Sequence, residues 1–150
     1  MEKNKLIPFP QADDFNKVIH LINFPKEKLK DNEYIKTNLH DITERQVNYY
    51  ISAAQYLNII DLKRNMTDVG LKLQALNSAE QIIELIRIMI ADEIIGTAFL
   101  TEMIYDFQLE KEELISMIRK KYPAYSDKIY SRRAQTLKSW LKWMKNNIDN

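Results

Sequence analysis

The stretch RKKYPAYSDKIYSRRAQTLKSWLKWMK, which runs from Arg119 to Lys145, concentrates positive charge with almost no acid to balance it. It contains nine Lys or Arg residues and one acid, Asp127, so its net charge is +8, whereas the whole chain carries only +1. The remainder therefore carries −7, the difference between +1 and +8. A segment this basic attracts polyanions, most obviously a nucleic-acid backbone. A solvated basic helix without a partner is the alternative.

The same stretch predicts one long amphipathic helix. Ser126 is a suitable N-cap, and no Pro or Gly interrupts the chain from there to about Asn146. If these residues are placed on an α-helix with about 3.6 residues per turn, one face carries cations, amides and hydroxyls: Lys128, Arg132, Gln135, Lys138, Ser139, Lys142 and Lys145. The opposite face is apolar: Ile129, Tyr130, Leu137, Trp140, Leu141 and Met144. Arg133 projects from the apolar side, so it either pairs with a buried acid or emerges where the core ends. A membrane-surface helix would look similar, but the many other apolar segments of the chain favour a packed one.

Composition favours helices and a reducing compartment. The chain has 150 residues, 45% of them apolar, which is enough for one compact unit or two small subdomains. It has only 2 Gly and 4 Pro, which disfavours barrels and phosphate-binding loops, and no Cys, which excludes disulfides and thiolate metal sites. The first residues, MEKNKLIPFPQ, lack the long apolar stretch of a signal peptide, and charges interrupt the apolar region 82–104. We therefore expect a cytoplasmic protein with no signal peptide and no membrane partner.

The order of predicted elements is that of a winged helix-turn-helix. Helices are expected near 13–22 and 31–39, and a Thr43-x-x-Gln46 capping box starts a third that runs to about Leu57. A short strand at 58–62, a turn at 63–65 and a returning strand at 66–67 form the predicted wing. Later helices are expected at 71–76, 79–91, 93–107, 110–121 and 126–146. The predicted fold class is therefore mainly α with a small β-hairpin. The predicted domains are an extended arm at 1–12, the winged helix-turn-helix at 13–77, and a helical hairpin with a second unit at 78–150.

The third helix of that unit would present its outer face to the DNA major groove. This face carries Arg45, Asn48, Tyr49, Ser52 and Tyr56. Arg and Asn can read guanine and adenine, whereas Ser and Tyr can hold phosphates. Many such modules bind only protein, and a similar face also occurs on helices that touch nothing.

The basic helix repeats the pattern of the third helix. RQVNYYISAAQYL (Arg45–Leu57) aligns with RRAQTLKSWLKWM (Arg132–Met144), and the apolar positions of the two segments coincide. Each segment also follows a shorter helix and a turn. We therefore expect two tandem helix-turn-helix units, joined by the apolar hairpin 82–107, of which the second has no wing.

Two of these runs also resemble a known family. ITERQVNYYISAAQYLNII followed by MTDVG, and the later YSRRAQTLKSWLKWM, are similar to winged-helix modules in the DNA-recognition portions of bacterial type II restriction endonucleases and related small proteins. The resemblance covers roughly residues 40–70 and 125–145. It implies site-specific DNA binding in a restriction-modification setting. The motif positions carried over are Arg45, Gln46, Asn48, Arg132, Arg133 and Gln135. The chain departs from the pattern at Asn58, where Gly is usual and a left-handed backbone is implied, and in its short wing.

Residues for catalysis are not evident. Glu110, Glu112 and Glu113 lie on a predicted helix with no neighbouring strand, and His20 and His40 are far apart in the sequence. No Walker loop, nucleophile elbow or His-Glu-x-x-His motif is present. We therefore expect no enzyme activity, no metal and no cofactor, unless the chain is a fragment of a larger restriction endonuclease.

Two functions remain open. The first is a sequence-specific double-stranded DNA-binding module, either a regulator or the recognition part of a restriction enzyme, as a homodimer or in a larger restriction complex. The second is a helical interaction protein whose 82–107 hairpin dimerises and whose basic end docks an acidic protein. The candidate DNA-binding residues are Arg45, Gln46, Asn48, Tyr49, Ser52, Arg64, Lys128, Arg132, Arg133, Gln135, Lys138 and Lys142.

Overall fold

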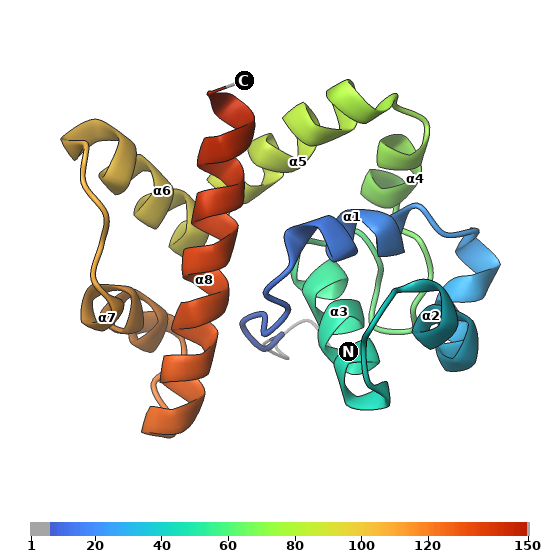
Figure 1. Cartoon of the computed structure of the whole chain (residues 1–150), viewed down its shortest axis with the longest axis horizontal. Coiled ribbons are helices and arrows are strands. Elements are labelled where there is room, and N and C mark those ends of the chain that lie inside the picture. Colours follow the sequence, from blue (N-terminus) through green and yellow to red (C-terminus); the bar gives the residue numbers. More distant parts are fainter. Residues whose placement is uncertain (1–6, 150) are drawn as a thin grey trace. The chain divides into compact units, whose positions relative to one another are not determined.

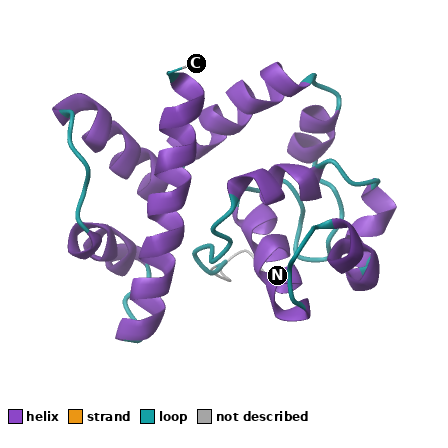
Figure 2. Cartoon of the chain, viewed as in Figure 1, coloured by secondary structure: helices purple, strands orange, loops and turns teal. Residues whose placement is uncertain are grey.

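The computed structural model describes residues 7–149. This part of the chain is helical and contains no β-strand (Figures 1 and 2). The elements are α1 Phe15–Ile22, η1 Lys26–Lys30, α2 Asn32–Asn38, α3 Glu44–Tyr56, α4 Asp68–Gln74, α5 Ser78–Ala91, α6 Glu93–Tyr105, α7 Lys111–Lys121 and α8 Asp127–Ile148. The chain divides into two compact units. The first unit consists of the chain up to Ala12 together with Asn16–Gln74. The second unit consists of the short segment Asp13–Phe15 together with the chain from Ala75 onward.

The predicted β-hairpin is wrong, and with it the fold class of a winged helix-turn-helix. Between α3 and α4 the chain makes only an isolated bridge from Ile60 to Met66. The hydroxyl of Thr67 donates to the carbonyls of Asn58 and Ile59, at 2.7 and 2.9 Å, which draws the chain straight into α4. The backbone carbonyls of this segment are hydrogen-bonded locally, and the segment is too short to form the paired strands of a β-hairpin. The described residues form an all-α fold.

Local signals that the sequence carries are confirmed in the first unit. The Thr43 hydroxyl accepts from the Gln46 amide at 3.2 Å, while the Gln46 side chain accepts from the Thr43 amide at 2.9 Å, so the capping box starts α3 as predicted. Asn58 has a φ of 61°, which confirms the left-handed backbone expected there. The core of this unit is apolar: Val18, Leu21, Leu29, Ile35, Leu39, Val47, Ile51, Ile59 and Leu73.

The extended arm predicted for 1–12 is described only from Ile7, because residues 1–6 lie outside the described part of the chain. Residues 7–12 are not helical, and Phe9 is buried with its ring edge-on to Tyr56, at 5.3 Å between centroids. This part of the arm therefore belongs to the core of the first unit.

The second unit begins with two helices that meet at a sharp corner. Asp92 ends α5 and caps α6, accepting from the amides of Ile94 and Ile95 at 3.1 and 2.9 Å. A methyl group at Gly96 would lie 2.0 Å from the carbonyl oxygen of Ile90, so only glycine permits this approach. The first turns of α6 are buried through Ile95 and Phe99, whereas its last turn is exposed at Ile104 and Tyr105.

Helices α7 and α8 lie side by side and are joined through a cluster of tyrosines (Figure 1). The hydroxyl of Tyr130 donates to the carbonyl of Tyr122, and the rings of Tyr122 and Tyr125 stack at 5.3 Å with 11° between their planes. Burial raises the pKa of the Tyr122 hydroxyl. These contacts hold the five-residue connection between the two helices.

The amphipathic pattern predicted for α8 is confirmed, as is its Ser126 N-cap. Trp140 is 0% exposed, and its ring lies edge-on to Phe15 at 4.9 Å. Ile129 is the exception, since it is exposed although its position predicts burial. The buried positions are Tyr130, Ala134, Thr136, Leu137, Trp140, Leu141 and Met144.

Candidate functional site

The outer face of α3 presents part of the predicted reading surface to solvent. Arg45 and Asn48 are exposed, whereas Tyr49 and Ser52 are half-buried. The Arg45 guanidinium lies 5.8 Å from the centre of the Tyr49 ring, which orients it along the helix. Gln46 is engaged in the capping box, so its amide has a structural role in the first turn.

Arg64 joins this face from the loop after α3. It has a φ of 65° and donates to Asn48 at 3.3 Å and also to Asn32 at the start of α2. The Asp61 carboxylate holds the turn by accepting from the amides of Asn65 and Lys63, at 2.8 and 2.9 Å. These bonds, first that from Asn65, lower the pKa of Asp61. The structure thus brings Arg64 to Asn48, 16 residues apart in the sequence, and adds Asn32, which the sequence analysis missed.

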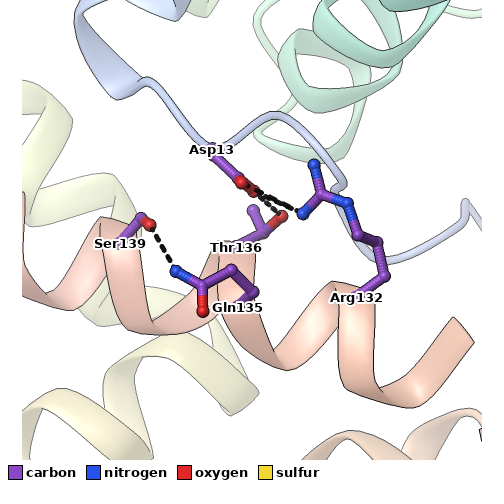
Figure 3. Close-up of polar contacts among 5 residues, drawn as sticks. All are labelled: Asp13, Arg132, Gln135, Thr136 and Ser139. Atoms are coloured by element: carbon purple, nitrogen blue, oxygen red, sulfur yellow. Dashed lines mark hydrogen bonds and ion pairs between the residues drawn. The ribbon is translucent and has the colours of Figure 1, made fainter. Parts of the chain in front are cut away.

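On α8, Arg132 is engaged in a structural ion pair (Figure 3). Its Nη1 lies 2.9 and 3.0 Å from the two carboxylate oxygens of Asp13, and the hydroxyl of Thr136 donates to the same carboxylate at 2.6 Å. Gln135 points along the helix toward Ser139, at 3.4 Å. Asp13 therefore neutralises one of the predicted DNA-contacting cations, and no sequence pattern linked residues this far apart.

Arginines also lie over the tyrosine cluster. The guanidinium of Arg133 lies 4.8 Å from the centre of the Tyr125 ring, and that of Arg119 lies 4.7 Å from the centre of the Tyr130 ring. Arg133 is half-buried, and its contact with the Tyr125 ring places it at the edge of the core of the second unit.

Four exposed cations surround the α7–α8 connection, and we call them the basic end: Arg119, Lys120, Lys121 and Lys128. The contact of Arg119 with Tyr130 brings the end of α7 to the first turns of α8. Among the residues that the structure describes, none of the four forms an ion pair. Their charge is therefore available to an anionic partner.

Lys138 and Lys142 lie elsewhere, on one wall of an open groove between α6 and α8. The groove has a volume of about 790 Å³. It is lined by Glu102, Met103, Asp106, Phe107, Gln108, Gln135, Lys138, Ser139, Leu141, Lys142, Lys145, Asn146 and Asp149. We call it the α6–α8 groove.

A buried carboxylate links α6 and α8 in this groove. Glu102 is 4% exposed, accepts from the amide of Leu109 at 2.8 Å, and forms an ion pair with Lys145 of α8. The pair joins the end of α6 to the last turns of α8 and neutralises one lysine of the basic stripe. The sequence analysis missed this role, although an acid inside an otherwise apolar helix is a signal that could have revealed it.

No helix in residues 7–149 is both long and apolar enough to span a bilayer. The same residues contain no group of three or more His, Cys, Asp or Glu side chains placed to hold a metal ion.

These features define an all-α protein of two units with a basic end and an open groove on the second. The chain belongs to the family described as "Domain of unknown function (DUF7226)", whose model matches residues 17–149. Neither a curated protein nor a solved structure matches it.

Proposed function

We propose that this protein binds double-stranded DNA, with the basic end as its contact to the phosphate backbone. The observation that carries the proposal is the set of four exposed cations around the α7–α8 connection, which form no ion pair among the described residues. Each cation placed at a phosphate releases condensed counterions, and this is the main source of sequence-independent affinity. Aromatic contacts orient Arg119 in this set and limit the entropy lost on binding.

Sequence preference would come from α3 in the first unit. Its exposed Arg45 and Asn48 have the chemistry to read bases, and Arg64 beside Asn48 can reach a phosphate. The resemblance of the α3 and α8 segments to DNA-recognition portions of restriction endonucleases supports the same partner. We therefore favour a bacterial, cytoplasmic role in restriction-modification, as a regulator or recognition part that binds DNA without catalysing a reaction.

The test is the salt dependence of binding to a mixed-sequence duplex, measured by fluorescence anisotropy. If all four cations of the basic end lie at phosphates, log K against log salt should have a slope of about −3.6, at ~0.9 per contact. Replacing Lys121 and Lys128 with Ala should make the slope shallower by about 1.8 and weaken binding to all sequences alike.

A matched control removes the same charge elsewhere. Lys26 and Lys72 are exposed and lie in the first unit, so Lys26→Ala with Lys72→Ala should leave the slope unchanged. Absence of binding at low salt would exclude the proposal. Equal slopes for the two double variants would show that net charge, and not the basic end, drives the binding.

A further inference from the structure

The last turns of α6 and the loop after it expose a large apolar surface. Ile104 and Tyr105 are each 71% exposed, and Leu100, Met103 and Phe107 are also exposed. The rings of Tyr105 and Phe107 contact edge to face, with 6.4 Å between centroids. A cluster of exposed apolar side chains on this scale is typical of an interaction surface.

The α6–α8 groove adjoins this surface and shares Met103 and Phe107 with it. Along α8 its lining runs from Gln135 to Asp149, which at ~1.5 Å per residue is a length of about 21 Å. A groove of this length, open to solvent and beside an exposed helix end, suits an occupant that lies along α8.

The charges that line the groove are segregated along its length. Lys138 and Lys142 lie toward the middle of α8, whereas Asp149 lies at its end and Asp106 follows Glu102 by one turn. Between these two groups the charges of Lys145 and Glu102 neutralise each other. A complementary partner must therefore carry acids at one end and cations at the other, together with apolar side chains to cover α6.

We propose that the partner is a second copy of this chain, bound as a two-fold symmetric dimer through the α6–α8 groove. In such an interface each contact occurs twice, because the same surface is used by both copies. An antiparallel arrangement of the two α8 helices places Lys138 and Lys142 of each copy opposite Asp106 and Asp149 of the other. The exposed end of α6 from each copy then covers the apolar wall of the opposite groove.

This dimer is independent of the proposed DNA binding. None of the four residues of the basic end lines the groove, so that surface stays exposed in the dimer. The two proposals can therefore fail separately. Lys138 and Lys142, which the sequence pattern groups with the DNA contacts, are assigned here to the dimer.

The experiment is a charge exchange followed by sedimentation equilibrium. Wild-type protein should dimerise, and the variants Lys138→Glu with Lys142→Glu, and Asp106→Lys with Asp149→Lys, should each dimerise at least tenfold more weakly, because like charges then face each other. An equimolar mixture of the two variants should restore the dimer, since every facing pair is again of opposite sign.

Control variants separate the interface from general effects. Lys26→Glu with Lys72→Glu makes the same charge change outside the groove and should dimerise as wild type does. Ile104→Ser should weaken the dimer, whereas Ile83→Ser, at a position of α5 that is 66% exposed, should not. A monomeric wild type, charge variants that dimerise normally, or a mixture that stays monomeric while circular dichroism shows folded helices would each overturn the proposal.

Discussion

Trp140 is the largest fully buried side chain among the residues that the structure describes. It lies on the buried face of α8, is 0% exposed, and packs edge-on against Phe15 at 4.9 Å. Trp143, three residues later, is half-buried, and its ring lies 4.3 Å from that of Phe15 at an angle of 40°. The two tryptophans thus touch the same phenylalanine but differ in burial, which makes Trp143 a matched control.

The expected cost of Trp140→Ala follows from its complete burial. Truncating a buried Trp or Phe to Ala costs about 3–5 kcal/mol, because apolar contacts are lost and a cavity remains. Against a typical total stability of about 5–15 kcal/mol, such a loss removes a large part of the stability. With a urea m-value of about 2 kcal/mol per molar, the midpoint should fall by about 1.5–2.5 M. Trp143→Ala removes less buried area, so its midpoint should fall by less than about 1 M.

Urea unfolding followed by tryptophan emission measures both variants, because each retains one of the 2 tryptophans of the chain, and both lie in α8. Far-ultraviolet circular dichroism, which reports the helices of both units, should give the same midpoints if the two units unfold together. A Trp140→Ala midpoint within about 0.5 M of wild type, or a larger fall for Trp143→Ala, would contradict the packing of α8 described above.

Two further predictions concern the corner between α5 and α6 and the outer face of α3. Gly96→Ala should destabilise the second unit by about 1–3 kcal/mol or more, seen as a lower urea midpoint, because the new methyl lies 2.0 Å from the Ile90 carbonyl oxygen; the neighbouring exposed Thr97→Ala should change it little. If α3 reads bases, Arg45→Ala and Asn48→Ala should each cost about 1–3 kcal/mol on the preferred site and relax base choice in a selection from random duplexes. Selection of the same site with undiminished preference would place recognition elsewhere.

Sequence reasoning was most accurate where short-range chemistry decides the structure. The Thr43 capping box, the Ser126 cap and the left-handed Asn58 each depend on residues within one turn, and the sequence shows all of them. The prediction of a wing was wrong because residues 58–67 resemble a β-hairpin only in composition. In the structure the hydroxyl of Thr67 and the carboxylate of Asp61 form hydrogen bonds to the backbone of this segment, and no paired strands form among these residues.

The candidate surfaces depended on contacts between distant residues. The periodicity of α8 identified a cationic face, but only the folded chain shows that Asp13 neutralises Arg132, that Glu102 neutralises Lys145, and that Lys138 lines a groove. The sequence is sufficient to locate most of the helices, several of their caps and the positive sign of the last third of the chain, because these depend on neighbouring residues and on composition. Which cations remain exposed, and which apolar turns of α6 stay uncovered, follows only from how the helices pack. Ion pairing and burial act over a few ångströms in space, between residues as distant in the chain as Asp13 and Arg132, which are 119 positions apart.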